Sequence, residues 1–189
     1  MGVRIFIDST ANVRKDYADK FTVVPLTVNF GTDSFADGVE IDNDTFYRKL
    51  VTSDVMPTTS QPTPDAFMQA FEEAVNAGDE VVVITISSKL SGTYQSATIA
   101  AADFEGKVFV VDGYTVAIGS GALAEYAVNL AEEGRTAAEI AEILEKEKEN
   151  IRVFAVVDTL EYLKKGGRVS AAVAFAETCR DSASTSPVC

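Results

Sequence analysis

Short hydrophobic runs and longer amphipathic stretches alternate along most of the chain. The short runs are rich in Val, Ile and Phe, as is typical of strands buried on both faces of a parallel sheet. They cover residues 3–8, 80–87, 107–112 and 151–158. Between them, apolar residues recur every three or four positions, and this period predicts helices. We expect these helices at residues 12–20, 44–51, 64–77, 93–102, 116–132 and 137–150.

The order of these elements predicts the fold class. Strands that alternate with helices form βαβ units, so we expect an α/β domain in which helices cover both faces of a parallel sheet. Thr63 followed by Pro64 is typical of a helix start. Pro25 interrupts a β-rich run at residues 21–30, which indicates an edge or irregular strand. Turn residues on either side of residues 34–35 predict a hairpin there.

Composition and charge narrow the classes of function. The chain has 189 residues, 47% of them hydrophobic, and a formal net charge of −13. Phosphate backbones and anionic lipid heads repel such an acidic chain, so we expect neither nucleic acid nor membrane surfaces as partners. No apolar run reaches the ~18 residues of a membrane span. Arg4 and Asp8 interrupt the first apolar run, unlike a signal peptide. We expect a cytoplasmic protein.

The chain contains no histidine and two cysteines, Cys179 and Cys189. Catalysis by a Ser-His-Asp or Cys-His arrangement within this chain is therefore excluded, because no imidazole is present to act as the base. The cysteines have no metal-ligand spacing, and zinc sites depend mostly on cysteine and histidine. We expect no metal site and no cofactor.

Two hydroxyl-rich stretches each lead into a predicted helix. They are PTTSQPTPD at residues 57–65 and SSKLSGTYQS at residues 87–96. In open α/β sheets, ligands bind beyond the carboxyl ends of the strands, where helix N-termini favour anions. Ser and Thr are also ordinary helix caps. The residues alone leave two interpretations open, which are a site for a carboxylate or phosphate and simple capping.

Three aspartates end predicted parallel strands, namely Asp8, Asp112 and Asp158. Carboxylates at one edge of a sheet can hold Mg²⁺ for phosphoryl transfer. A magnesium-dependent phosphatase or phosphotransferase that uses Asp8 and Asp112 is therefore an alternative function. An Asp at the end of a strand is also a common cap or turn residue.

Several stretches, taken in order along the chain, carry a family resemblance. They are IDSTAN, PTTSQPTPDAF, ITISSKLSGTYQSA, VFVVDGYTVAIGSGAL and TLEYLKKGGRV. Together they resemble the DegV family of bacterial fatty-acid-binding proteins. The resemblance covers about residues 1–175, and the TSQP and LSGTYQSA segments are its most specific part in combination.

The resemblance implies a function and a site. Members of the family bind one long-chain fatty acid in a tunnel, and hydroxyls of the TSQP and LSG segments hold its carboxylate. The corresponding residues here are Thr59 and Ser91, with Ser60 and the backbone of Gly92 as neighbours. The family presents the fatty acid to a separate kinase that makes an acyl phosphate, which implies a lipid carrier and not an enzyme. The shared GGR motif makes Arg168 a candidate contact for the head group or the kinase.

Family members continue after the GGR motif with a second α/β domain, which supplies a tunnel wall and a histidine near the head group. Here, residues 177–189 are Ser-rich and lack periodicity. We expect a DegV-like lipid-binding domain over residues 1–176, a disordered or aberrant tail over residues 177–189, and no second domain. Its loss would expose apolar surface and a strand edge at residues 151–157, so we expect self-association. A non-functional fragment is a further alternative.

Overall fold

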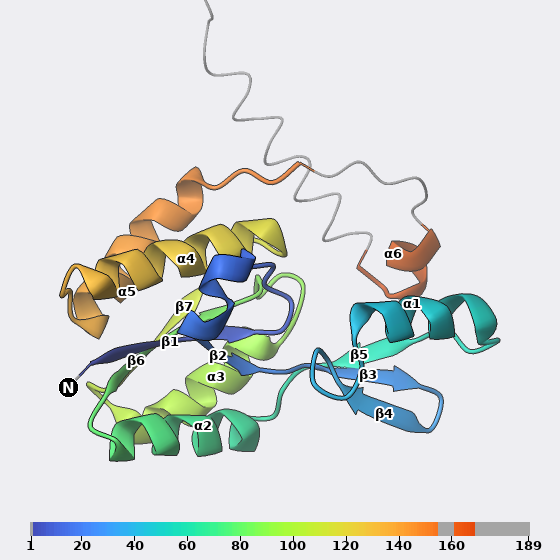
Figure 1. The fold of residues 1–189 in the computed structure, drawn as a ribbon, viewed down its shortest axis with the longest axis horizontal. Coiled ribbons are helices and arrows are strands. Elements are labelled where there is room, and N and C mark those ends of the chain that lie inside the picture. The colour runs from blue at the N-terminus through green and yellow to red at the C-terminus, as the bar shows by residue number, and fades with distance from the viewer. Residues whose placement is uncertain (1, 155–160, 169–189) are drawn as a thin grey trace, which may run out of the picture. The chain divides into compact units, whose positions relative to one another are not determined.

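The structure is a computed structural model that describes residues 2–154 and 161–168. The chain divides into two compact units, Met1–Ile151 and Arg152–Cys189, and each is described by itself. Figure 1 shows the ribbon with its helices and strands labelled. The sequence predictions for Asp158, for both cysteines and for the tail at residues 177–189 lie outside the described residues.

A parallel sheet forms the centre of the first unit (Figure 1). Its strands, in spatial order, are β2 (Phe21–Val24), β1 (Val3–Asp8), β6 (Glu80–Thr85) and β7 (Val108–Asp112). Every neighbouring pair runs parallel. The predicted α/β fold with a parallel sheet is confirmed. The strand that ends just before Pro25 lies at an edge, where proline breaks no ladder bond.

Helices cover both faces of this sheet (Figure 1). One face carries α2 (Pro64–Asn76) and α3 (Thr93–Ala101), and the other carries α4 (Ile118–Glu132) and α5 (Ala137–Glu147). Successive side chains of a strand point to opposite faces. In β6, Val81 and Val83 therefore pack with α2 and α3, whereas Val82 and Ile84 pack with α4 and α5. All four side chains are buried, which explains the continuous hydrophobic run in the sequence.

A smaller antiparallel sheet follows β2 in the chain. Its strands, in spatial order, are β4 (Asp33–Ala36), β3 (Thr27–Phe30) and β5 (Thr58–Ser60), and α1 (Asn43–Thr52) lies between β4 and β5 in sequence. The predicted hairpin is present, but its turn begins at Gly31 and residues 34–35 belong to its second strand. The sequence predicts a loop at residues 58–60, whereas the structure pairs them with β3. Pairing with a distant strand overrides the weak local preference of Thr-Thr-Ser.

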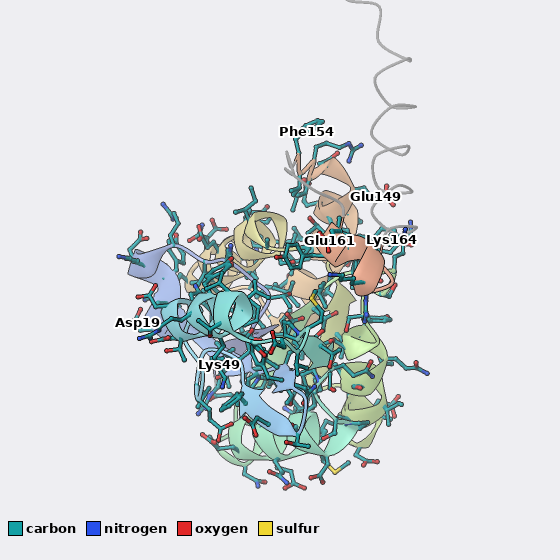
Figure 2. The ribbon with its side chains drawn as sticks, turned by 90° about the vertical axis from the view of Figure 1, so that its right-hand side faces the viewer. Asp19, Lys49, Glu149, Phe154, Glu161 and Lys164 are labelled. Carbon is teal, nitrogen blue, oxygen red and sulfur yellow. The ribbon has the colours of Figure 1, made fainter. Side chains whose placement is uncertain are left out.

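The small sheet has its own apolar cluster, formed by Val28, Phe30, Phe35, Ile41 and Phe46. The ammonium of Lys49, labelled in Figure 2, lies 5.5 Å from the centre of the Phe30 ring and 5.2 Å from that of Phe35. This cluster is separate from the two clusters that flank the parallel sheet. Contacts between loops therefore decide how the small sheet is held against the large one.

Two sequence predictions need correction. The helix expected at residues 12–20 is reduced to a short 3-10 helix at Lys15–Lys20. The strand expected at residues 151–158 is absent from its described part, because residues 151–154 pair with no strand. A β-rich composition does not make a strand without a hydrogen-bonded neighbour. Within the described chain, the edges of the parallel sheet are β2 and β7.

Short elements complete the description. Two further 3-10 helices occupy Ala102–Phe104 and Lys148–Asn150. In the second unit, Phe154, labelled in Figure 2, is 80% exposed. That unit contains the short helix α6 (Glu161–Lys165). Across residues 2–154 and 161–168, no helix combines the length and the apolar character that a membrane span requires.

Candidate functional site

Thr59 lies at the centre of β5, opposite Val28 of β3. Its side chain is exposed, and its hydroxyl has no hydrogen-bond partner in the described chain. Ser60 is the next residue of the strand, so its side chain leaves the opposite side of the strand. The Ser60 hydroxyl accepts a hydrogen bond from Asn29 Nδ2 at 3.1 Å, which places it toward β3. The structure thus separates the two adjacent hydroxyls and leaves that of Thr59 available.

Ser91 lies in the loop after β6, just before α3. Its Oγ accepts a hydrogen bond from the backbone N–H of Thr93 at 3.3 Å and lies 2.8 Å from Thr93 Oγ1. Thr93 is fully buried, whereas Ser91 is half-buried. If Thr93 donates its proton to Ser91, the proton of Ser91 is free to donate to a ligand. Ser91 is therefore the outer member of a hydroxyl pair at the start of a helix.

Gln61 connects the two hydroxyl segments. Its Nε2 donates to the carbonyl oxygen of Gly92 at 3.2 Å and to Ser96 Oγ at 2.9 Å. We call this pair of hydrogen bonds the Gln61 bridge. The residue before a proline favours an extended backbone, and Pro62 follows Gln61. Residues two apart in an extended segment share a side, so we infer that Thr59 faces the side on which Gln61 reaches α3.

The Gln61 bridge also explains Gly92. A Cβ at this position would overlap the Gln61 side chain, and the three nearest heavy atoms all belong to that amide. The φ angle of Gly92 is −78°, which any residue adopts, so glycine is present for space and not for backbone freedom. The Gln61 side chain fills this space. The backbone N–H of Gly92 has no partner in the described chain and remains a candidate donor.

Sequence reasoning missed Gln61, because an amide inside a Pro- and Thr-rich loop looks like an ordinary polar residue. The contact spans 31 residues to Gly92 and 35 to Ser96. A local pattern cannot show such a pairing. The available signal was the glycine itself, since Gly92 stands at a helix start where Ser, Thr or Asp is the usual cap.

Asp8 is a buried structural link. Its Oδ1 accepts hydrogen bonds from the backbone N–H of Thr10 at 2.9 Å and from the Thr10 hydroxyl at 2.5 Å. Its Oδ2 accepts from the backbone N–H of Ile86 at 2.6 Å, which connects the ends of β1 and β6. Burial raises the pKa of the Asp8 carboxyl, and the hydrogen bonds from Thr10 and Ile86 oppose that rise.

Asp112 has a similar role at the end of β7. Its Oδ1 accepts from the backbone N–H groups of Ser88 and Tyr114, at 3.0 and 3.1 Å. These bonds join the loop after β6 to the loop after β7. Within residues 2–154 and 161–168, no group of three or more Asp, Glu or Cys side chains is placed to hold a metal ion. Asp8 and Asp112 act here as loop anchors.

Apolar side chains are exposed near this edge of the sheet. Tyr114, between β7 and α4, is 45% exposed, and Ile118, the first residue of α4, is 61% exposed. Tyr114 and Ala117 both have positive φ, at 56° and 54°. Left-handed backbone is costly for such residues and is found mostly at functional sites and tight turns. Lys89, from the loop that also carries Ser91, places its ammonium 4.7 Å from the centre of the Tyr114 ring.

Arg168 belongs to the second unit. Its side chain is exposed, and its Nη1 donates to the carbonyl oxygen of Gly166 at 2.5 Å. Gly167 has a φ of 72°, so the GGR motif forms a tight turn after α6.

Comparison with known proteins identifies the family. The family model described as uncharacterised proteins of the DegV family matches residues 2–180. The chain belongs to the DegV family. A DegV domain-containing protein of Caldanaerobacter subterraneus is 38% identical over 171 residues, which cover 89% of this chain and 61% of that protein. A DegV domain-containing protein of Deinococcus radiodurans is 36% identical over 177 residues, with coverage of 93% and 63%. The chain thus spans less than two thirds of these relatives.

Solved DegV structures share the fold. A DegV family protein of Thermus thermophilus, described as fatty-acid-binding, superposes with a TM-score of 0.81 at 37% identity, over 94% of this chain and 64% of that protein. DegV of Bacillus subtilis, a fatty acid binding protein, gives 0.83 at 31% identity with the same coverage. A stearic acid-binding protein of Eubacterium ventriosum gives 0.76 at 30% identity, over 89% and 60%. The resemblance noted from the sequence is confirmed.

Proposed function

We propose that this chain binds a long-chain fatty acid and that the hydroxyls of Thr59 and Ser91 hold its carboxylate. Two findings support the proposal. Solved relatives of the family are described as fatty-acid-binding. The observation that carries it in this chain is the Gln61 bridge, which brings the segment of Thr59 against the start of α3, where Ser91 lies.

The chemistry of the site suits a carboxylate. A carboxylate accepts hydrogen bonds only. The Thr59 hydroxyl can donate to it, and so can the Ser91 hydroxyl when Thr93 is the donor within the Ser91–Thr93 pair. The N-terminus of α3 adds a partial positive charge and the unpaired N–H of Gly92. The Ser60 hydroxyl accepts from Asn29 and keeps its own proton as a further donor, on the side of β5 opposite Thr59.

The acyl chain would supply most of the affinity. Burying about 15 methylene groups at about 0.8 kcal/mol each gives about 12 kcal/mol before costs. Association and ordering remove several kcal/mol of this gain. The exposed Tyr114 and Ile118 supply apolar surface near the edge of the sheet on which Ser91 lies. The hydroxyls then decide the orientation of the head group rather than the strength of binding.

We also propose that the bound carboxylate is presented to a separate cytoplasmic kinase, so that this chain acts as a carrier and not as an enzyme. Neutral donors support this role, because a carboxylate held by hydroxyls is released more easily than one in a salt bridge. Arg168, an exposed cation in the GGR turn, is the proposed contact for the head group or the kinase.

Native mass spectrometry and a fluorescent fatty-acid titration test the proposal. Purified protein should carry a discrete added mass of a fatty acid. Thr59→Val and Ser91→Ala should each weaken binding by about 1–2 kcal/mol, because each removes one hydrogen bond to a charged group. Ser88→Ala is the matched control, since Ser88 is exposed in the same loop and its side chain has no partner in the described chain.

Absence of saturable fatty-acid binding by the unsubstituted chain would contradict the proposed function. Equal effects of Ser88→Ala and Ser91→Ala would instead show that the loop, and not the Ser91 hydroxyl, matters for binding. Loss of secondary structure in Thr59→Val, seen by circular dichroism, would assign that residue a folding role.

A further inference from the structure

Gln61 is the side chain that joins the small sheet to the start of α3. We propose that Gln61 is a positioning residue: its amide fixes the distance between the Thr59 and Ser91 hydroxyls, so that both donate to one carboxylate. This inference rests on the proposed function and adds to it a residue that does not itself contact the ligand.

The strand that carries Thr59 is weakly held by its own sheet. β5 contains three residues and is an edge strand of the small sheet, paired only with β3. All three of its side chains are exposed. Such a short, exposed edge strand depends on contacts outside the sheet to keep one position. The Gln61 bridge is such a contact, one residue beyond the end of β5.

The small sheet is joined to the large one at a second place, at the same end of its strands as Gln61. Ser9, just after β1, donates to Asp37 Oδ2 at 2.8 Å and accepts from the backbone N–H of Leu26 at 3.1 Å. This contact holds the loops around β3 and β4. It does not involve β5, whose end beside Thr27 is tied to α3 by the Gln61 bridge. Ser9 therefore anchors the small sheet, while Gln61 sets the position of Thr59.

The chemistry of Gln61 is specific to an amide. Both Nε2 protons are used, one for the Gly92 carbonyl and one for Ser96 Oγ. Glutamate in this position has no N–H to donate, so its carboxylate would repel the Gly92 carbonyl and a nearby anionic ligand. Alanine removes the bridge without adding a charge. The two variants therefore separate loss of position from added repulsion.

A titration with two ligands provides the first test. Gln61→Ala should weaken binding of a fluorescent long-chain fatty acid by about five- to twentyfold, because two hydrogen bonds to one carboxylate lose their geometry. The methyl ester of the same acid has no charge, so its affinity should change less than about twofold. Gln61→Glu should weaken acid binding more than Gln61→Ala. Gln69→Ala is the matched control, because Gln69 lies on α2 and bonds only to Asp65.

A second test uses the close contact between Gln61 and Gly92. Gly92→Ala should weaken acid binding about as much as Gln61→Ala, because its Cβ would displace the amide. In the Gln61→Ala background, the same Gly92→Ala change should cost less than about twofold, since the three heavy atoms nearest to the Cβ belong to Gln61. Such suppression arises only if the two residues act through one contact.

The outcomes separate this inference from the proposed function. If the unsubstituted chain binds no fatty acid, the proposed function fails. If it binds, and Thr59→Val and Ser91→Ala weaken binding while Gln61→Ala does not, the positioning role is wrong and the proposed function stands. A Gln61→Ala variant that loses affinity equally for the acid and the ester has a general structural role, which also contradicts the inference.

Discussion

Replacing Asp8 distinguishes a structural carboxylate from one retained for phosphoryl transfer. Asp8 is 1% exposed and accepts three hydrogen bonds, one from Ile86 and two from Thr10. A buried carboxylate with a structural role increases the free energy of unfolding. A buried carboxylate retained for chemistry decreases it, because the desolvation cost of the charge exceeds the stabilisation from its hydrogen bonds. The sign of the change in unfolding free energy on substitution of Asp8 therefore distinguishes the two roles.

The contacts give the expected magnitudes. Asparagine keeps one acceptor oxygen, which can face the buried Ile86 N–H, while its amide can donate to the Thr10 hydroxyl. The Thr10 N–H then loses its partner, so Asp8→Asn should lower the unfolding free energy by about 1–2 kcal/mol. Asp8→Ala leaves both N–H groups without a partner and should cost about 3–4 kcal/mol. At about 2–4 °C per kcal/mol for a chain of this size, the alanine variant should lose roughly 6–16 °C in melting temperature.

Asp112→Asn is the matched control. Asp112 receives both of its hydrogen bonds on one oxygen, Oδ1, which asparagine retains. We expect a change of less than about 0.5 kcal/mol there, as for substitutions that break no contact. Urea unfolding followed by circular dichroism measures all three variants, with unchanged slopes as the check on two-state behaviour. A more stable Asp8→Asn variant, together with magnesium-dependent phosphatase activity that it abolishes, would refute the structural role.

Two further predictions concern other parts of the fold. Gly121→Ala should lower the unfolding free energy by about 2 kcal/mol or more, because a Cβ at Gly121 would overlap the backbone of Asn12. An unchanged midpoint of urea unfolding would show instead that α4 can move away from Asn12 without cost. Hydrogen bonds from the Gly2 N–H and then from the Arg4 side chain lower the pKa of Asp79. Asp79 therefore stabilises the fold at pH values above the usual carboxyl pKa of 3.8, and this stabilisation is lost as the pH falls through the folded-state pKa. The difference in unfolding free energy between the unsubstituted chain and Asp79→Asn should therefore be constant near neutral pH and shrink below about pH 4; a difference that grows in acid would reverse this assignment.

The parallel sheet and its helices could be predicted because their signals are local. A continuous hydrophobic run such as β6 indicates a strand that is buried on both faces. Thr63 with Pro64 indicates the start of α2, and in the structure the Thr63 hydroxyl accepts a hydrogen bond from the Ala66 N–H there. The small sheet was only partly predictable. Its hairpin has turn residues in the sequence, whereas β5 is three exposed residues whose strand conformation depends on β3, about thirty residues earlier.

The candidate site could be predicted as a pair of segments but not as an assembly. Hydroxyl type and helix position indicated the stretches that contain Thr59 and Ser91. Neither property shows that Ser60 faces away from Thr59, or that Gln61 fills the space beside Gly92. The direction of Ser60 depends on the alternation of side chains in β5, a strand that the sequence did not predict. The position of Gln61 depends on a contact with residues more than thirty positions away in the sequence.

The division of the site between two sheets has a consequence for release of a ligand. Thr59 belongs to the small sheet and Ser91 to the start of α3 on the large one, and each sheet has its own apolar cluster. A shift of β5 would therefore separate the two proposed donors without opening the two clusters that flank the parallel sheet. A buried acyl chain is worth about 12 kcal/mol before costs, so loss of one hydroxyl contact would free the carboxylate while the chain stays bound. On the proposed function, the Gln61 bridge thus controls access to the head group, which is the part that a phosphorylating partner must reach.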